Sequence, residues 1–406
     1  MKTLVPRGLL PYLGFLTQAF LVSDARVGVR LLCAAEHPAV PGVIIDHSPA
    51  SSGIYIGSPS LAVLTNGGYV ACHDEFGPKS TEHSRAVSHI FQSRDRGAHW
   101  EKISTIDGAF WSTLFTHRGA LYVIGPDKHH GHVLIRRSLD GGVTWTSPTN
   151  SMTGLLRGDG QYHCAPVPVI EHTGRLWRGM ERRDPPVAWG INYRAGMLSV
   201  PVDADLLNAA NWSCSNFLPS DRAWNGGDMG AWLEGNAVVT PGGEVLDVLR
   251  VQTKSANEKA AIVRISRDGK VASFDPAAGF IKFPGGAKKF TIRFDPKTKR
   301  YWSLASIVLD ADRDREPGGV RNTLALTTSS DLLNWEVRCI LLHHLDVASH
   351  GFQYVDWLSD GEDIIAACRP AFDDDQGGAH NAHDANFLTF HRFARFSHLT
   401  MSDSVP

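Results

Sequence analysis

The chain has 406 residues, of which 43% are hydrophobic and 20% are charged, and its formal net charge at pH 7 is -2. This near-neutral balance excludes the broad basic field that attracts nucleic acid or anionic lipid. After residue 30, no stretch reaches the about 20 consecutive apolar residues that a membrane-spanning helix needs. We therefore expect no nucleic-acid partner and no membrane partner, and enough length for one large domain or two modest ones.

The N-terminus has the pattern of a secretory signal. Two basic residues precede an apolar run over residues 9–22, which is followed by small residues. This order is typical of a signal peptide that is removed on secretion. We therefore predict that residues 1–25 are a signal peptide and that the protein is secreted, either outside the cell or into a periplasm. Residues 26–50 then form an N-terminal segment.

Six β-hairpins recur along the rest of the chain. Each has two short apolar strands joined by a tight turn rich in Gly, Asn, Asp or Pro. The hairpins cover residues 54–78, 110–126, 162–181, 232–251, 288–307 and 352–369. Their spacing of about 45 to 70 residues, without long amphipathic helices between them, indicates a repeat architecture rather than a βαβ alternation.

Two segments between the hairpins end in the same motif, S-x-D-x-G-x-x-W. The motif occupies residues 93–100 and 138–145, which are 45 residues apart, and weaker copies lie at residues 266–269 and 330–335. In such a turn the Asp carboxylate accepts hydrogen bonds from backbone N–H groups and the Gly adopts a positive φ. We expect the Trp to pack on the neighbouring hairpin.

These motifs resemble the Asp-boxes, or BNR repeats, of sialidase-like β-propellers. In that group each blade has four antiparallel strands and the Asp-box joins the third to the fourth. The resemblance implies an all-β, six-bladed β-propeller over residues 51–396, followed by a tail at 397–406; seven blades is the alternative. We expect a strand at residues 42–46 to pair with residues 387–393 and to close the last blade, which removes free sheet edges.

One face of such a propeller carries the starts of the first strands and the ends of the second strands. In the third hairpin, Tyr162 and His163 begin the first strand and Arg178 lies in the second, so all three should share one end. Arg250 and Arg369 take the same place as Arg178 in two other blades. Converging guanidinium groups favour a carboxylate, because each offers two parallel donors. The pattern predicts an anionic ligand.

The sialidase resemblance implies one assignment of this face. That family uses an arginine triad on the sialate carboxylate, a Tyr nucleophile assisted by Glu, and an Asp acid. Here the nucleophile would be Tyr162, its partner Glu234, and the triad the three arginines named above. Two departures are visible, because the family's Arg-Ile-Pro motif is missing and His73 stands where the first triad arginine is expected. This assignment predicts an exo-glycoside hydrolase.

The face also resembles that of propeller polysaccharide lyases that act on uronate-containing glycans. In those enzymes an Arg neutralises the uronate carboxylate, and Tyr or His transfers the protons of a β-elimination. This hypothesis, which we favour from the sequence, assigns proton transfer to Tyr162 and His73, with His163 as an alternative, and the carboxylate to Arg178. The residues assigned to substrate binding are Arg250, Arg369, Asn236, Glu234, His380, His383, Asp384 and His83.

Other functions remain open at this point. A non-catalytic glycan-binding propeller needs only a cationic funnel lined by aromatic residues such as Trp111 and Trp232. In each hypothesis the partner is an acidic oligosaccharide or polysaccharide and no cofactor is required. A divalent metal could bind in the loop that contains His380, His383 and Asp384, because His and Asp are ordinary ligands.

Overall fold

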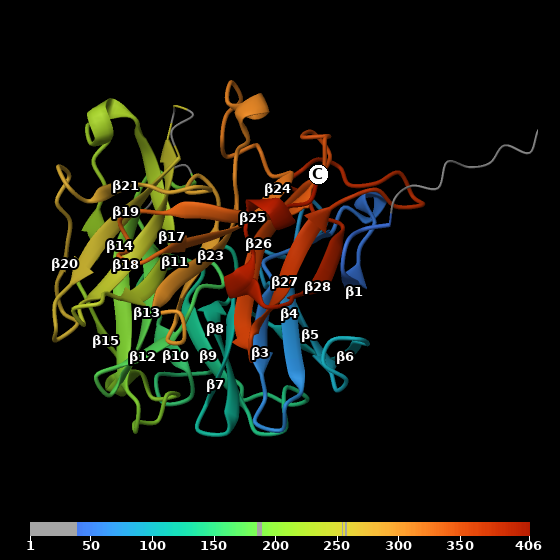
Figure 1. Ribbon diagram of the computed structural model, residues 1–406. Helices are drawn as coiled ribbons and strands as arrows, with labels where there is room; N and C mark the ends of the chain where they lie inside the picture. The colour runs from blue at the N-terminus through green and yellow to red at the C-terminus, as the bar shows by residue number, and fades with distance from the viewer. Residues whose placement is uncertain (1–38, 185–188, 254, 256–257) are drawn as a thin grey trace, which may run out of the picture. The chain divides into compact units, whose positions relative to one another are not determined.

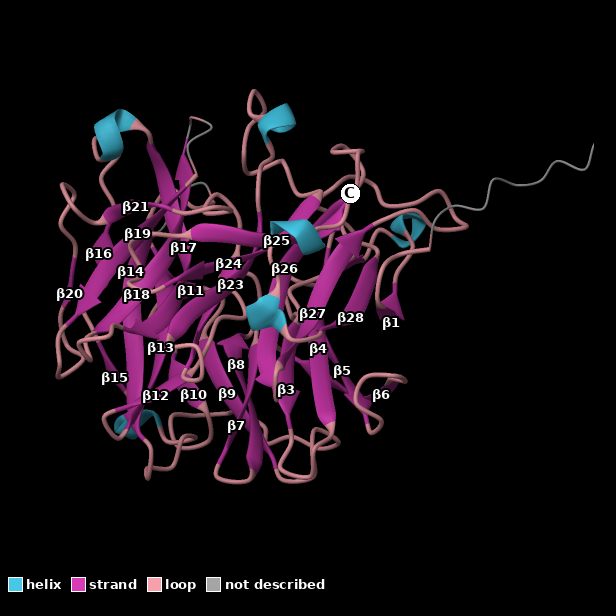
Figure 2. Cartoon of the chain, viewed as in Figure 1, coloured by secondary structure: helices cyan, strands magenta, loops and turns pink. Residues whose placement is uncertain are grey.

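The computed structural model describes residues 39–184, 189–253, 255 and 258–406. In this part of the chain, β-strands make up almost all of the regular structure (Figures 1 and 2), and they form six small antiparallel sheets arranged as a six-bladed β-propeller. The predicted fold is confirmed. The predicted signal peptide lies outside the described residues. Among those residues, none of the helices has the length and apolar character needed to cross a membrane.

The strands of each blade follow one another along the chain. Blade 1 contains β2 (Tyr55–Ile56), β3 (Ser60–Val63), β4 (Tyr69–Phe76), β5 (Val87–Ser93) and β6 (Glu101–Asp107). Blade 2 contains β7 (Thr113–His117), β8 (Ala120–Pro126), β9 (Val133–Ser138) and β10 (Leu155–Arg157). Blade 3 contains β11 (Gln161–His163), β12 (Ile170–His172), β13 (Arg175–Arg183), β14 (Tyr193–Pro201), β15 (Ser213–Cys214) and β16 (Leu218–Pro219).

The second half of the chain forms the other three blades. Blade 4 contains β17 (Met229–Val239), β18 (Val245–Thr253), β19 (Lys259–Ile265), β20 (Ala272–Ser273) and β21 (Phe280–Lys282). Blade 5 contains β22 (Phe290–Asp295), β23 (Arg300–Ser306), β24 (Thr323–Ser329) and β25 (Glu336–His343). Blade 6 contains β26 (Gly351–Asp360), β27 (Asp363–Ala371), β28 (Phe387–Phe393) and β1 (Val43–His47). The 3-10 helices of the described chain are Ala50–Ser52, Ala209–Asn211, Asn225–Gly227, Asp310–Asp312, Phe396–His398 and Met401–Asp403.

Blade 6 is closed by the start of the described chain. Strand β1 pairs antiparallel with β28, so that Val43 lies opposite Phe390 and His47 lies opposite Phe387. This is the pairing predicted from the sequence, displaced by one residue at each end of β1. All six predicted hairpins are also present, as the pairs β3–β4, β7–β8, β12–β13, β17–β18, β22–β23 and β26–β27.

The turns after the third strands have the predicted hydrogen bonds. Asp95 accepts from the backbone N–H of His99 at 2.9 Å, and Asp140 accepts from that of Thr144 at 2.9 Å. Gly97 and Gly142 have φ values of 94° and 106°. A turn at Asp331 in blade 5 has the same bonding, with Asn334 N–H as the donor at 2.8 Å. These turns lie at the ends of the third strands.

Polar side chains near the inner strands hold neighbouring blades in register. Ser60 of blade 1 donates to Asp356 of blade 6 at 2.8 Å. Asn236 of blade 4 accepts from the backbone of blade 5 at 3.0 Å, and Thr291 of blade 5 donates to the backbone of blade 6 at 2.8 Å. All four side chains are buried. A buried polar group must find a partner, so these bonds fix how the inner strands sit around the axis.

Candidate functional site

Two inner strands carry a bulge at the same place. The pairing with the second strand is irregular around Glu234 in β17 and around Tyr354 in β26. The φ values of these two residues are 61° and 56°, a left-handed conformation that is uncommon for residues other than glycine. Bulges often re-aim a side chain next to an active site, and the backbone strain concentrates at such sites.

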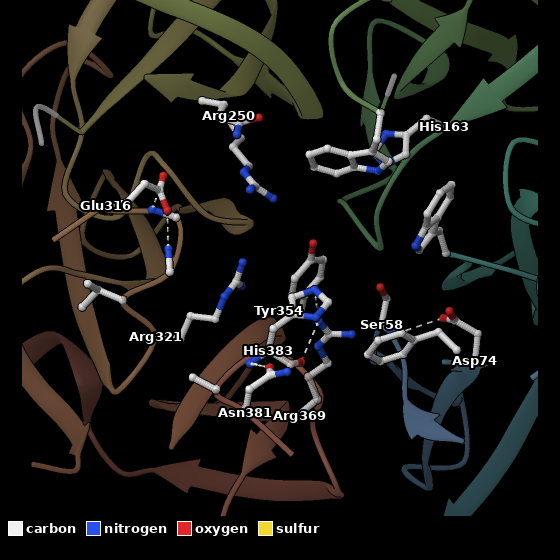
Figure 3. Close-up of a pocket in the computed structure, with 18 of the residues that line it drawn as sticks. Ser58, Asp74, His163, Arg250, Glu316, Arg321, Tyr354, Arg369, Asn381 and His383 are labelled. Carbon is white, nitrogen blue, oxygen red and sulfur yellow. Dashed lines mark hydrogen bonds between the residues drawn. The ribbon is translucent and has the colours of Figure 1, made fainter. Parts of the chain in front are cut away.

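A cavity of about 740 Å³ is lined by residues of all six blades and therefore surrounds the propeller axis (Figure 3). Its wall on the side of blades 4 to 6 is cationic. The wall on the side of blades 2 and 3 is aromatic and contains Phe110, Trp111, His129, His163 and Trp189. Blade 1 contributes two carboxyl groups, those of Asp74 and Glu82. Acidic, basic and aromatic groups thus surround one space, as in many ligand sites.

A tyrosine, a carboxylate and a guanidinium form a chain of hydrogen bonds at this cavity. The Tyr354 hydroxyl donates to Glu234 Oε1 at 3.0 Å, and Arg250 Nη1 donates to Glu234 Oε2 at 3.0 Å. All three side chains are buried. Burial raises the pKa of Tyr354, and the Glu234 charge raises it further. The phenol is therefore neutral at physiological pH, with a carboxylate placed to accept its proton.

Three arginines, Arg250, Arg321 and Arg369, come from blades 4, 5 and 6 and point toward the space around Tyr354 (Figure 3). The Arg369 guanidinium lies 4.1 Å from the centre of the Tyr354 ring. Arg321 Nη1 donates to Gln353 Oε1 at 2.6 Å, and burial lowers the pKa of Arg321 to about 10. Within the described chain, neither Arg321 nor Arg369 has a carboxylate at ion-pair distance. The cluster is therefore suited to an anion.

Asp74 faces the cavity from β4 on blade 1. Its Oδ1 accepts from the backbone N–H of Ser58 at 3.1 Å, and its Oδ2 has no hydrogen-bond partner among the described residues. Burial raises the pKa of Asp74 to about 7, although the charges of His73 and Arg369 oppose the rise. A carboxyl group with such a pKa can both give and take a proton near neutral pH.

The aromatic wall is fixed by a buried histidine. His163 Nδ1 lies 2.8 Å from Glu181 Oε2, and both side chains are buried. Burial lowers the pKa of His163 to about 3, so its imidazole is neutral at physiological pH. The ring centroid of Trp111 lies 4.4 Å from that of His163. This wall offers flat, weakly polar surfaces on which a sugar ring can pack.

The structure brings only part of the predicted site together. His163, Arg250, Arg369 and His383 line the cavity, and Glu234 bonds to two residues that line it. Tyr162 is fully buried between blades 2 and 3, and its hydroxyl donates to Asp159 at 2.8 Å. His73 lies 2.8 Å from Asp46. Neither Tyr162 nor His73 lines the cavity.

The physical reason is the alternation of side chains along a strand. Neighbouring residues point to opposite faces, so His163 and Asp74 can face the cavity only if Tyr162 and His73 face away. The structure therefore separates Tyr162 from His163, which alone lines the cavity. It likewise separates His73 from this cavity, which the adjacent Asp74 lines instead.

Arg178 is also displaced from its predicted place. It is the fourth residue of β13, whereas Arg250 and Arg369 are the sixth and seventh residues of strands of the same length. It is fully buried and donates to Thr113 Oγ1 and to the Ala165 carbonyl, both at 3.1 Å. It therefore joins blade 3 to blade 2 rather than facing the ligand space. Asn236 likewise joins blades 4 and 5.

The loop between β27 and β28 holds the remaining predicted residues. Asp384 binds His383 through Oδ1 and His380 through Oδ2, each at 2.9 Å. Arg369 Nη2 lies 3.3 Å from His383 Nε2, so this loop supports the arginine cluster. A metal ion at these residues stays a prediction. His83 lies 3.1 Å from Glu82, beside the cavity.

The roles assigned from the sequence did not include Tyr354, Arg321 or Asp74, which all line the cavity. A signal for Tyr354 is present in hindsight. Asn236 and Asp356 each form a hydrogen bond to the next blade, so they occupy equivalent positions in their blades. Glu234 and Tyr354 precede them by two residues and are therefore equivalent as well. Arg321 lies in the loop between β23 and β24, on the face where the sequence places the ligand, but no repeat pattern distinguishes it there.

No family model matches the chain, and no curated protein matches its sequence. Solved structures share the fold. A protein of unknown function from Dyadobacter fermentans has a TM-score of 0.55 and 15% identity over 88% of this chain and 98% of its own. The Hadza microbial sialidase Hz136 has a TM-score of 0.57 and 12% identity, over 88% of this chain and 69% of its own. The Penicillium chrysogenum α-L-arabinanase complexed with arabinobiose has a TM-score of 0.53 and 13% identity, over 88% of this chain and 98% of its own.

Identities this low establish similarity of fold alone. The fold resemblance to sialidase-like propellers, which was based on the turn motifs, agrees with these neighbours. The resemblance to propeller lyases stays a prediction. The side chains of the cavity, rather than the fold, determine what such a propeller binds or converts.

Proposed function

We propose that the protein is a sialidase-like glycoside hydrolase that releases a terminal, carboxylate-bearing sugar from an acidic glycan. The observation that carries this proposal is the hydrogen bond from Tyr354 to Glu234 inside the cluster of Arg250, Arg321 and Arg369. The proposal keeps the hydrolase hypothesis but replaces Tyr162 by Tyr354 and Arg178 by Arg321.

The arginine cluster would bind the carboxylate of the substrate. Arg250 already shares its charge with Glu234, whereas Arg321 and Arg369 have no carboxylate partner in the described chain. A carboxylate placed among them would accept several charge-assisted hydrogen bonds in a buried setting. Burial strengthens such bonds because little water competes for them.

Tyr354 would act as the nucleophile. A neutral phenol suits this position, because a carboxylate nucleophile would be repelled by the carboxylate of the substrate. Tyr354 Oη would attack the anomeric carbon while Glu234 accepts its proton, so that a covalent glycosyl–tyrosine forms. Arg250 Nη1 forms an ion pair with Glu234 Oε2 at 3.0 Å and holds this side chain in place.

Asp74 would act as the acid and then the base. Its proton would pass to the glycosidic oxygen as the C–O bond breaks, which lets the leaving group depart as an alcohol. Its carboxylate would then take a proton from the water that attacks the anomeric carbon. The Tyr354 oxygen leaves and regains its proton from Glu234. The raised pKa of Asp74 suits both steps near neutral pH.

The test is a substrate panel combined with trapping of the intermediate. We would incubate the protein with sialosides, uronate oligosaccharides and arabino-oligosaccharides, and record released sugar beside the ultraviolet absorbance of unsaturated uronates. A fluorinated acidic sugar with an activated leaving group slows breakdown of the covalent intermediate more than its formation. The expected result is release of an acidic sugar and a glycosyl mass increase on the peptide that contains Tyr354.

Other outcomes would overturn the proposal. An ultraviolet signal that depends on Tyr354 would mean β-elimination, which the uronate-lyase hypothesis predicts. Release of arabinose with no action on acidic sugars would remove the proposed role of the arginine cluster. Binding of acidic glycans without turnover or labelling would leave a glycan-binding protein.

A further inference from the structure

A second group of potential ligands lies beside the cavity, where blade 1 meets blade 2. Glu82 and His83 belong to the loop after β4, and His129 belongs to the loop after β8. His83 Nε2 lies 3.1 Å from Glu82 Oε1, and His129 Nδ1 lies 3.3 Å from the same oxygen. One ligand atom from each residue lies within 4.8 Å of the others. Two imidazoles and a carboxylate thus converge on one point.

These separations fit an ion pair, and they also fit the ligand spacing of a metal site. Zinc bonds to His nitrogen and carboxylate oxygen are about 2.0–2.1 Å long, which places neighbouring ligand atoms of a tetrahedral site ~3.3 Å apart. The two nitrogen–oxygen separations, 3.1 and 3.3 Å, fall at this value. Both imidazole nitrogens also approach the same oxygen, Glu82 Oε1, and a cation bound by all three atoms would explain this arrangement.

The backbone holds the two loops in this arrangement. The N–H of His129 donates to the carbonyl of Glu82 at 2.8 Å, which joins the loops directly. Glu82 Oε2 accepts from the N–H of Gly77 at 3.3 Å, so its Oε1 is turned toward the imidazoles. The second loop is wound tightly around Asp127, and a Cβ at Gly131 would lie 1.8 Å from that carboxylate. Pre-positioned ligands reduce the ordering cost of binding an ion.

We propose that Glu82, His83 and His129 bind one divalent transition-metal ion, with Zn²⁺ the best match. Mixed nitrogen and oxygen ligands favour zinc or its neighbours in the transition series over Mg²⁺ and Ca²⁺, which prefer oxygen ligands alone. Three protein ligands leave a further coordination position for water or a substrate oxygen. Because Glu82 and His129 line the cavity, the ion would clamp the two loops and form part of the wall.

The site is separate from the loop at His380, His383 and Asp384, for which the sequence suggested a metal. In that loop each imidazole bonds to a different oxygen of Asp384, so the nitrogens do not converge on one oxygen. The proposal also does not depend on the hydrolase mechanism. A protein with no hydrolase activity could still bind the ion.

The test is a metal titration of the full chain, produced without a histidine tag and stripped with a chelator. Zn²⁺ is added in competition with a chromophoric chelator, and Co²⁺ is added separately because its visible spectrum reports nitrogen and oxygen ligation. We expect one equivalent of Zn²⁺ to bind. Glu82→Gln, His83→Ala and His129→Ala should each weaken binding at least about tenfold. His83 has an exposed side chain, so its substitution should leave the fold intact.

The matched control is His132→Ala. His132 belongs to the same loop as His129, and its nearest carboxylate, Asp127, is 3.9 Å away. This variant should bind Zn²⁺ like the parent protein. The proposal is overturned if the parent protein binds no equivalent of Zn²⁺. It is also overturned if binding survives in both His83→Ala and His129→Ala, or is lost only in His380→Ala.

Discussion

The hydroxyl of Tyr354 donates to Glu234 Oε1 at 3.0 Å, although 120 positions separate the two residues in the chain. Each residue occupies the left-handed conformation of a bulge in an inner strand, one in blade 6 and one in blade 4. Their contact therefore exists only when both blades stand in their places around the axis. The candidate active site is thus a product of the closed ring rather than of any single hairpin.

Tyr354→Phe tests the role of this hydroxyl. The substitution removes one oxygen and leaves the ring under Arg369, so the fold should be retained. If Tyr354 is the nucleophile, kcat on an acidic glycoside should fall about 100-fold or more, because no covalent intermediate can form on Phe. Steady-state kinetics and labelling with the fluorinated sugar measure the effect.

The control for this variant is Tyr301→Phe. Tyr301 is also buried and its hydroxyl also donates, to the Val239 carbonyl at 2.6 Å, but it does not line the cavity. Its loss should alter thermal stability more than activity. Equal activity of the two variants would contradict the role of Tyr354.

The pKa of Asp74 predicts the pH dependence of activity. Burial raises this pKa to about 7, and cleavage needs the protonated form. The value of kcat/KM should therefore fall as the pH rises through about 7. Asp74→Asn cannot donate a proton, so kcat should drop about 100- to 10,000-fold on a glycoside with an alcohol leaving group. The drop should be much smaller with a nitrophenyl leaving group, and an equal drop on both substrates would argue against an acid role.

The same pKa predicts a change in stability. The folded protein keeps the Asp74 proton up to pH of about 7, whereas the unfolded chain releases it near its ordinary pKa of 3.8. Between these values the folded state binds more protons, so this residue's contribution to the free energy of unfolding decreases as the pH rises. Urea unfolding of Asp74→Asn at several pH values should show a weaker decrease than the parent protein. If the free energy of unfolding depends on pH equally in the variant and the parent protein, then folding does not raise the pKa of Asp74.

The fold was predictable because its signals are local and repeated. Alternating apolar residues, Gly-rich turns and the S-x-D-x-G-x-x-W turns each need only a few neighbouring residues, and every copy supports the others. The closing pair was also predictable. The last blade needs a strand from the start of the domain to close the ring. The apolar segments at the two ends of the domain, now β1 and β28, were the candidates for this pair.

The site was harder to predict because it depends on which face each residue takes. A shift of one residue along a strand turns a side chain away from the cavity, and this separates Tyr162 from His163 and His73 from Asp74. The bulges add a second difficulty, since they change the alternation at Glu234 and Tyr354. The sequence therefore predicted the kinds of side chain near the axis better than the particular positions that face the cavity.

Arg321→Lys tests whether the cavity binds a carboxylate. Lysine keeps the positive charge but loses the planar fork that can bind two oxygens at once. Hydrogen bonds to charged groups contribute about 1.5–3 kcal/mol, so KM for an acidic substrate should rise about 10- to 100-fold. The methyl ester of the same substrate is the control, because its neutral group should bind both proteins equally. A similar loss on acid and ester would mean that Arg321 only supports the structure.

Asp356→Ala tests how the ring is held together. The buried carboxylate of Asp356 accepts from Ser60 Oγ at 2.8 Å, from the Leu61 N–H at 3.0 Å and from Arg293 Nη2 at 3.1 Å. The Trp357 N–H also donates to this carboxylate, at 3.0 Å, so its removal leaves a positive charge and three donors without their partner at the junction of blades 5, 6 and 1. We expect the free energy of unfolding to fall by about 3–5 kcal/mol, as when one member of a buried ion pair is removed.

Urea unfolding measures this loss, with Asp268→Ala as the matched control. Asp268 makes comparable hydrogen bonds, to Ser266 Oγ at 2.6 Å and to the Lys270 N–H at 3.1 Å, but it lies in an exposed turn of one blade. Water can replace those bonds, so the control should unfold close to the parent protein. If both variants unfold at the same urea concentration as the parent, the blades are held by apolar packing and the Asp356 contacts add nothing measurable.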